Sequence, residues 1–120
     1  MASLLDIPLY RIAHCRAGDK GDRSNISVIA WRPEFYPTLV EQVTPASVRM
    51  HFSHRHPGSI ARYLLPAIHA MNLVIDDVLD GGVNQALNLD SHGKSLSYWL
   101  LDMRVAVPAD WAPLLAGPTE

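Results

Sequence analysis

The chain is organised around twelve consecutive residues, His14-Cys15-Arg16-Ala17-Gly18-Asp19-Lys20-Gly21-Asp22-Arg23-Ser24-Asn25. This run, which we call the polar segment, holds two glycines, two carboxylates, three cations, a histidine, a hydroxyl and an amide. Hydrophobic residues make up 48% of the chain, so such a concentration of polar groups stands out. It predicts a loop that carries the functional site.

The residues on either side of the polar segment predict strands. Residues 9–17 alternate, with His14 and Arg16 on one face and Cys15 and Ala17 on the other. The β-branched run over 26–31 predicts a well-buried strand. Farther along, apolar spacing predicts three helices, over 33–43, 45–56 and 67–79, and three strands, over 59–65, 83–89 and 96–107.

This order of elements predicts an α/β two-layer sandwich. We expect one mixed sheet, helices on one of its faces, and a C-terminal β-hairpin formed by the last two strands. We expect one domain over residues 1–120, with an ordered core over 9–107 and a tail over 108–120. The tail has an apolar anchor that docks on this chain or on a neighbouring subunit: Trp111, Leu114 and Leu115.

Composition narrows the class of protein. The formal net charge is −2, with a pI of about 6.3, so the chain lacks the basic field that nucleic acids and acidic lipids require. No stretch approaches the roughly 20 apolar residues of a membrane span, and the N-terminus does not resemble a signal peptide. The single cysteine suits a reducing compartment. We therefore expect a cytoplasmic protein in which Cys15 is a buried hydrophobic residue rather than a nucleophile.

The polar segment can be interpreted in two ways. Its glycines, Gly18 and Gly21, can expose backbone N–H groups to a phosphate or carboxylate, assisted by three cations, Arg16, Lys20 and Arg23. Its carboxylates, Asp19 and Asp22, oppose an anion unless those cations pair with them. The spacing matches neither a P-loop nor an EF-hand. The alternative is a salt-bridged turn between two strands.

Three histidines, His51, His54 and His56, invite a metal site because neutral imidazole is a common metal ligand. No cysteine or carboxylate lies close in sequence to complete a set of ligands. We favour a polar helix end in which histidine complements the helix dipole, and we expect no metal and no cofactor.

The helix expected over 67–79 has a polar edge beside its apolar stripe. His69, Asn72 and Asp76 share that edge at spacings i, i+3 and i+7. Carboxylates then crowd the expected helix end, where the macrodipole disfavours them, so we expect cations to approach. The candidates are Arg62 and the cations of the polar segment.

The chain resembles the small C-terminal domain of the acyclic terpene utilisation protein AtuA family. The resemblance covers 10–108, and its strongest carrier is the Gly-Asp-Lys-Gly-Asp core of the polar segment with its trailing Ser-Asn. Arg62-Tyr63-Leu64-Leu65-Pro66-Ala67-Ile68-His69-Ala70-Met71-Asn72, Asp80-Gly81-Gly82-Val83 and Leu101-Asp102 follow the same pattern. The resemblance implies a ferredoxin-like fold. It also implies a link to bacterial breakdown of acyclic terpenes and related branched acyl-CoA compounds.

Many members carry this domain behind a larger N-terminal one, so the resemblance implies that this chain is a small subunit with a separately encoded large partner. Three functions stay open. The first is a ligand-binding subunit that binds an anion through Arg16, Gly18, Asp19, Lys20, Gly21, Asp22, Ser24, Asn25 and Asn72. The second is a structural module that assembles with itself or with the large subunit through the tail, as a homo-oligomer. The third is an enzyme with His14 or His69 as general base, assisted by Asp19 or Asp22.

Overall fold

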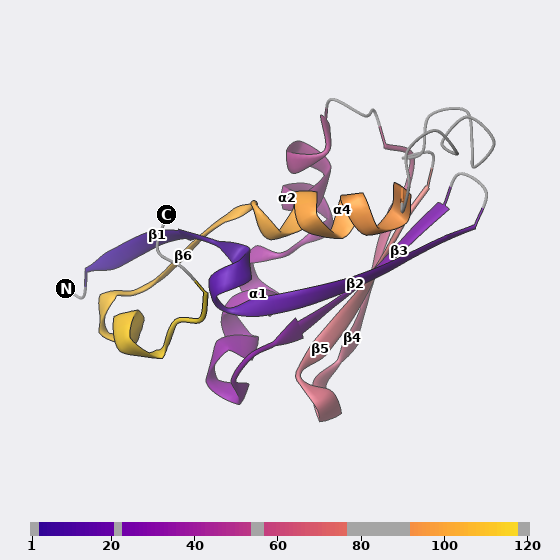
Figure 1. The fold of residues 1–120 in the computed structure, drawn as a ribbon. Helices are drawn as coiled ribbons and strands as arrows, with labels where there is room; N and C mark the ends of the chain where they lie inside the picture. The colour runs from indigo at the N-terminus through magenta and orange to yellow at the C-terminus, as the bar shows by residue number, and fades with distance from the viewer. Residues whose placement is uncertain (1–2, 21–22, 54–56, 77–91, 118–120) are drawn as a thin grey trace.

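The computed structural model describes residues 3–20, 23–53, 57–76 and 92–117 (Figure 1). In chain order, the strands are β1 (Leu4–Pro8), β2 (Ala13–Lys20), β3 (Arg23–Ala30), β4 (Ile60–Leu65), β5 (Ala70–Ile75) and β6 (Arg104–Pro108). The α-helices are α1 (Tyr36–Gln42), α2 (Pro45–His51) and α4 (His92–Leu101). Single turns of 3₁₀-helix form η1 (Leu9–Arg11), η2 (Pro33–Phe35) and η4 (Pro66–Ile68), and a longer one forms η5 (Ala109–Leu114).

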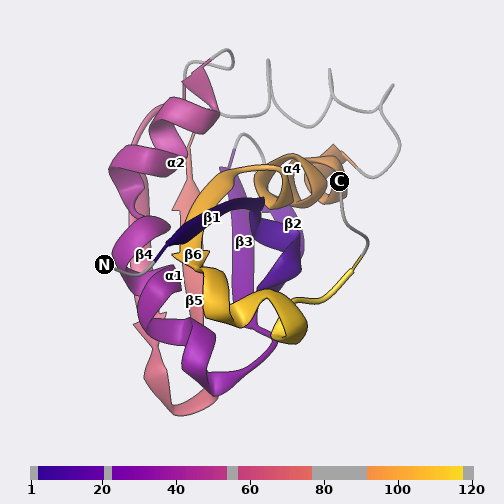
Figure 2. The ribbon, with the colours of Figure 1, turned by 90° about the vertical axis from the view of Figure 1, so that its left-hand side faces the viewer.

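The described strands form two antiparallel sheets. The larger sheet has the order β2-β3-β5-β4, and the smaller one pairs β1 with β6. Figure 2 shows α1 and α2 beside β4 and α4 beside β2, with the smaller sheet between them. The α/β two-layer class expected from the sequence is confirmed. The expected single mixed sheet is not found, because every described pairing is antiparallel and β1, which the sequence pattern did not predict, makes a separate sheet with β6.

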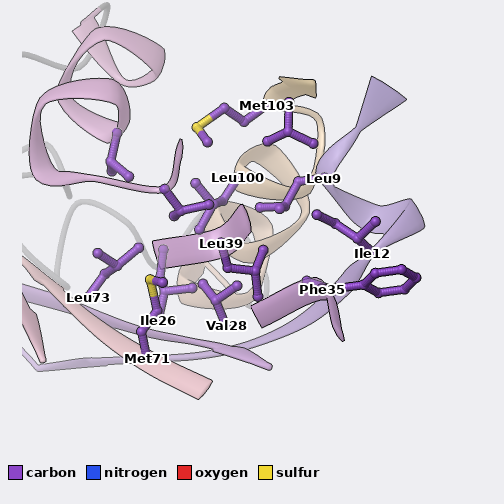
Figure 3. Close-up of a cluster of buried hydrophobic side chains, with 14 of the residues drawn as sticks. Leu9, Ile12, Ile26, Val28, Phe35, Leu39, Met71, Leu73, Leu100 and Met103 are labelled. Atoms are coloured by element: carbon purple, nitrogen blue, oxygen red, sulfur yellow. The ribbon is translucent and has the colours of Figure 1, made fainter. Parts of the chain in front are cut away.

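The core lies between the larger sheet and the helices (Figure 3). Alternate residues of the central strands point into it, including Val28 of β3 and Met71 of β5, which are paired in register and fully buried. The helices contribute Leu39 and Leu100 from the other side. Complete burial of such a side chain stabilises the fold by about 1.5–3 kcal/mol relative to exposure. The opposite face of the larger sheet carries the residues in between.

Helix α2 begins where the sequence predicts it. Thr44 is the N-cap, and its Oγ1 accepts a hydrogen bond of 3.1 Å from the backbone N–H of Ser47. In return, the backbone N–H of Thr44 donates to Ser47 Oγ at 2.9 Å, which completes a capping box. Pro45 occupies the first helical position, where its missing N–H is not needed.

The polar segment forms parts of two paired strands rather than the loop that its composition predicts. Strand β2 continues through Lys20 and β3 starts at Arg23, so only the junction at 21–22 lies outside the described residues. Cys15 and Ala17 pack against the core, whereas Arg16 and Gly18 face solvent. His14, Arg16 and Asn25 therefore share one face of a hairpin, whereas Ser24 lies on its buried face. The face assignment is confirmed for residues 13–17, but the predicted strand starts too early, because residues 9–11 form η1 and Ile12 is buried in the core.

The helix predicted over 67–79 is also wrong. Residues 66–68 form the 3₁₀ turn η4, His69 takes a left-handed conformation with φ of 54°, and β5 follows. Met71, Leu73 and Ile75 are buried at the spacing of a strand. Residues 77–79 lie outside the described part of the chain. His69, Asn72 and Asp76 consequently do not share a helix edge.

The predicted C-terminal hairpin is replaced by a helix and a strand. Residues 92–101 form α4, whose Ser97 and Leu100 are buried at spacing i, i+3, and only 104–108 are extended. The chain leaves the helix at Asp102, whose backbone N–H donates to the carbonyl of Trp99. The expected strand over 83–89 and the glycines at 81–82 lie outside the described residues. Of the turn predicted over 90–93, residues 90 and 91 also lie outside them, whereas His92 and Gly93 begin α4.

The tail docks on its own chain. Trp111 of η5 lies against Phe35, with ring centroids 4.9 Å apart, and both Leu114 and Leu115 pack against the core. The backbone N–H of Ala116 also donates to the carbonyl of Arg11 at 2.9 Å. The sequence left open whether the tail docks on its own chain or on a neighbouring subunit, and in the structure it packs on its own chain. Within the described residues, no helix has the length and hydrophobicity needed to cross a membrane.

We predict that Trp111→Ala lowers the free energy of unfolding by about 2 kcal/mol, because truncating a half-buried aromatic removes part of the 3–5 kcal/mol measured for fully buried ones. Urea unfolding monitored by circular dichroism measures it. Tyr98→Ala removes an exposed aromatic from α4 and is the matched control, expected to change stability by less than about 0.5 kcal/mol. Equal losses in the two variants would contradict the docking of the tail.

Candidate functional site

The uncovered face of the larger sheet brings several of the predicted site residues together. The strand registers align Arg16 of β2 with Ser27 of β3, and Ser27 with Asn72 of β5. Asn72 is in turn aligned with Tyr63 of β4. Side chains that are opposite each other on neighbouring antiparallel strands lie about 4.5–5.5 Å apart at Cβ. These four residues therefore form one polar row across the sheet, in which Ser27 Oγ donates to Asn72 Oδ1 at 3.4 Å.

The next two rows hold other candidates. His14 is aligned with Ile29 on one side of the polar row, and Gly18 is aligned with Asn25 on the other. His14, Gly18 and Asn25 thus share the uncovered face with Arg16 and Asn72. Ser24 does not, because it lies on the buried face and its hydroxyl donates to the Gly18 carbonyl at 3.4 Å.

Four candidates are only partly described or are not described. The backbones of Asp19 and Lys20 belong to β2, where Asp19 pairs with Ser24 and Lys20 with Arg23. Their side chains lie outside the described part of the chain, as do Gly21 and Asp22 entirely.

Arg16 differs from most arginines of the chain in having a free guanidinium. It is exposed, and it has neither an ion pair nor a hydrogen bond within the described residues. By contrast, the arginines that are tied to a carboxylate or a backbone carbonyl are Arg11, Arg23, Arg49, Arg62 and Arg104. Arg32, also exposed, shares the free state of Arg16.

Arg16 borders a pocket of about 240 Å³ between β2 and α4. The other lining residues are Cys15 and Ala17 of β2 and Ser97 and Tyr98 of α4. The pocket thus combines one cation and two hydroxyl-bearing residues with an apolar strand surface. A cation beside hydroxyl donors is an arrangement that can bind a carboxylate or a phosphate.

Gly18 keeps the sheet surface open next to Arg16. It lies in a regular strand, so its role is not the turn predicted from the sequence. A Cβ added at this position would meet no atom within 4 Å. A ligand can therefore approach the backbone of β2 closely at Gly18.

The two histidine candidates lie in different environments. The His14 ring stacks on Trp31, with centroids 4.3 Å apart, and Trp31 Nε1 donates to the carbonyl of Tyr10. The His69 ring meets the edge of Tyr36 at 5.9 Å. Within the described residues, neither imidazole has a hydrogen bond to a nucleophile or to a carboxylate, so no catalytic pair is formed there.

The thiol of Cys15 has low reactivity. Burial raises the pKa of its thiol to about 12, because the low-polarity surroundings disfavour the thiolate. The thiolate is the nucleophilic form, so Cys15 cannot serve as a nucleophile at neutral pH in this environment. Cys15 was expected to be a buried hydrophobic residue; it is half-buried, packed against the core on one side and lining the pocket on the other.

A cation of the polar segment does meet an acid of the later segment, as the sequence predicts. Arg23 Nε lies 2.6 Å from Asp76 Oδ1, and Ser59 Oγ donates to Asp76 Oδ2 at the same distance. The hydrogen bond from Ser59, followed by the one from Arg23, lowers the pKa of Asp76. Arg62, the other predicted partner, instead donates to the carbonyls of Val40 and Val43 at the end of α1.

His51 is engaged in a helix contact. Its Nε2 lies 2.7 Å from the carbonyl oxygen of Trp99, and Trp99 Nε1 donates to the His51 carbonyl at 3.3 Å. This reciprocal pair joins α2 to α4. His54 and His56 lie outside the described residues, and the described part of the chain contains no group of three potential metal ligands.

Sequence reasoning did not identify Ser27, Trp31 and Tyr98. Ser27 gives a signal, since it is the one polar residue in the β-branched run over 26–31 and such a residue marks the solvent face. Tyr98 gives no such signal, because the sequence pattern over 96–107 predicts a strand rather than a helix.

A family model described as the AtuA ferredoxin-like domain matches residues 7–106. No curated protein and no solved structure matched the chain.

We predict that Cys15 reacts very slowly with a thiol reagent while the chain is folded. At a pKa of about 12 only roughly one thiol in 10,000 is ionised at pH 8. Labelling with iodoacetamide at pH 8, followed by mass spectrometry, should show an unmodified native chain and a rapidly modified chain in urea. Rapid labelling of the folded chain would contradict the assigned environment.

We also predict an acid-sensitive contribution from Asp76. Because its pKa is lowered in the folded chain, its stabilising effect is complete above the ordinary aspartate pKa of about 3.9 and is lost as pH falls through the lowered pKa. Asp76→Asn should therefore melt below the unsubstituted protein at pH 7, and the two melting temperatures should converge in acid. Asp110→Asn controls for loss of one exposed carboxylate. A gap that persists in acid would contradict the ion pair.

Proposed function

The chain belongs to the AtuA ferredoxin-like domain family, as the polar segment predicts, and we propose that it is a ligand-binding domain. In this proposal it binds the anionic group of a small carboxylate or acyl-CoA compound beside Arg16. The family resemblance suggests the setting, an AtuA-like system in the bacterial breakdown of acyclic terpenes or related branched acyl compounds. The large partner subunit and a homo-oligomer stay predictions from the sequence.

The observation that carries the proposal is that Arg16, whose guanidinium has no partner within the described residues, is one of the residues that line a pocket. A guanidinium offers a planar fork of N–H donors that fits a carboxylate or a phosphate in a bidentate manner. Most other described arginines are already bonded to carboxylates or carbonyls, so among the described side chains of this sheet Arg16 is a cation that is available for a ligand.

The pocket volume limits what enters. Pockets that enclose a drug-sized molecule measure about 300–1,000 Å³, whereas this one measures about 240 Å³. The carboxylate or thioester end of a short acyl compound fits such a volume, with its chain against Ala17 and the Cys15 side. The nucleotide of a CoA ester would remain outside, on the open surface beside Gly18.

The polar row supports an extended contact on the sheet. Asn72 and Ser27 lie beside Arg16 in register on the uncovered face, whereas Cys15 and Ala17 line the pocket from the opposite face of β2. The amide of Asn72 and the hydroxyl of Ser27 can bond the part of a ligand that lies on the uncovered face, outside the pocket. His14 and Trp31 add a ring pair at the neighbouring row. These groups can orient the ligand and give specificity around one cation, and small-molecule sites commonly contain only a few such polar groups.

The chemistry of the described residues favours binding over catalysis. The Cys15 thiol is protonated at neutral pH, and neither His14 nor His69 is paired with a nucleophile. A base without a nucleophile or a charged partner contributes little to acyl transfer. The alternative of a structural module that assembles through its tail loses support, because the tail packs against Phe35 of its own chain.

We predict that Arg16→Gln weakens anion binding at least tenfold, since a charge-assisted hydrogen bond contributes about 1.5–3 kcal/mol. Calorimetric titration with inorganic phosphate, 3-methylbutanoate, free CoA and a short branched acyl-CoA measures it. Arg32→Gln removes the other free, exposed guanidinium and is the matched control, expected to bind like the unsubstituted protein.

Gly18→Ala probes the open surface beside the site. The added methyl meets no protein atom within 4 Å, so the fold should tolerate it, whereas a CoA ester lying over the strand should bind more weakly. The free carboxylate, confined to the pocket, should bind unchanged. Equal binding by the Arg16 and Arg32 variants, or no binding of any of the four probes to the unsubstituted protein, would refute the proposal.

A further inference from the structure

The pocket beside Arg16 owes its space to the small side chains of β2. At the two core-facing positions that line the pocket, this strand carries Cys15 and Ala17. The residues aligned with them on β3 are larger and fully buried: Val28 with Cys15, and Ile26 with Ala17. Because protein interiors are normally packed without voids larger than a water molecule, the smaller residues of β2 leave room that larger ones would fill.

Helix α4 adds to this room from the other side. Ser97 lines the pocket and is 6% exposed, whereas Leu100, one turn later, is fully buried in the core. Tyr98 also lines the pocket but is 71% exposed, so it lies at the mouth. The interior wall therefore consists of small side chains from β2 and α4, and an aromatic ring stands at the opening.

The volume limits the chain that the pocket can enclose. An apolar cavity of about 150 Å³ holds benzene, which has six non-hydrogen atoms. By that proportion, the volume of about 240 Å³ holds roughly ten non-hydrogen atoms. Three of them are the carbon and the two oxygens of a carboxylate group. The pocket thus has room for a monocarboxylate of about eight carbons in all.

The wall also suits an apolar chain. Burial raises the pKa of the Cys15 thiol to about 12, so this side chain presents an uncharged sulfur. Within the described residues, no carboxylate lines the pocket, and its one charged lining residue is Arg16. A ligand with an anionic end at Arg16 and an apolar chain between β2 and α4 therefore meets no repulsion.

We propose that Cys15, Ala17 and Ser97 are the specificity-determining residues of this pocket, and that they select apolar monocarboxylates of up to about eight carbons. This inference rests on the function proposed above and names the size class of its ligand. Each methylene that is buried in the pocket raises affinity by up to about fourfold. Carbons beyond the eighth pass Tyr98 into water, so affinity stops rising at that length.

Calorimetric titration with acetate, butanoate, hexanoate, octanoate and decanoate tests this limit. In the unsubstituted protein, affinity should rise from acetate to octanoate and then level off, with decanoate binding no more tightly than octanoate. Ala17→Val adds two carbons inside the pocket, so the rise should end at hexanoate while acetate binds unchanged. Ala61→Val makes the same change at a half-buried alanine of β4, outside the pocket, and should leave the series unaltered.

The melting temperature separates an effect on binding from an effect on folding. Valine suits a strand and here fills open space, so Ala17→Val should melt no lower than the unsubstituted protein. Cys15→Met narrows the same pocket and takes the place of Ala17→Val if that variant does not fold.

Three results would overturn this inference and leave the proposed function standing. They are acetate binding as tight as octanoate binding, a rise that continues through decanoate, and a series that neither pocket variant alters. Failure of every carboxylate to bind would also overturn it, and if phosphate, CoA and the acyl-CoA failed as well, the proposed function would fall with it.

Discussion

One face of the four-stranded sheet is buried and the other is not, and the rest of the molecule follows from this difference. Because side chains alternate along a strand, the register that places Val28 beside Met71 in the core also places Ser27 beside Asn72 on the surface. A slip of one residue would exchange the two sets. Burial of the apolar set therefore fixes the polar row to which Arg16 belongs, and the candidate site is a consequence of core packing.

Sequence patterns predicted the elements whose signals are local. The Thr44-Pro45 pair marked the start of α2, because an N-cap hydroxyl followed by proline satisfies the requirements of a first helical turn. The apolar run over 26–31 marked β3. Both signals depend on a few neighbouring residues and on no distant partner, so the sequence alone was sufficient.

The errors occurred where one pattern fits two structures. Met71 and Ile75 are four residues apart, as on a helix face, but Met71, Leu73 and Ile75 also alternate, and pairing with β3 and β4 decides for the strand. Residues 96–107 show the reverse case: their pattern predicts a strand, but 96–101 belong to helix α4, which packs on β2. The polar segment was taken for a loop because its composition was polar. What composition did not reveal is that only one face of that hairpin meets water.

The same reasoning explains how much of the site was predicted. Arg16, Gly18, Asn25 and Asn72 were identified from residue type, and they do share one face. Their neighbours Ser27, Trp31 and Tyr98 belong to the site only through strand register or helix packing, which the sequence does not state. The pair of Arg23 with Asp76 was expected on electrostatic grounds, and it forms even though Asp76 follows a strand rather than ending a helix.

The most direct test of the central claim, that Arg16 and its pocket form an anion site on this sheet, is an NMR titration. Backbone amide resonances of the labelled protein are followed while 3-methylbutanoate is added. The account predicts saturable shifts concentrated at residues 15–18 of β2 and at Ser97 and Tyr98 of α4, and little change at the smaller sheet. Shifts absent from these residues, or centred on another surface, would contradict it.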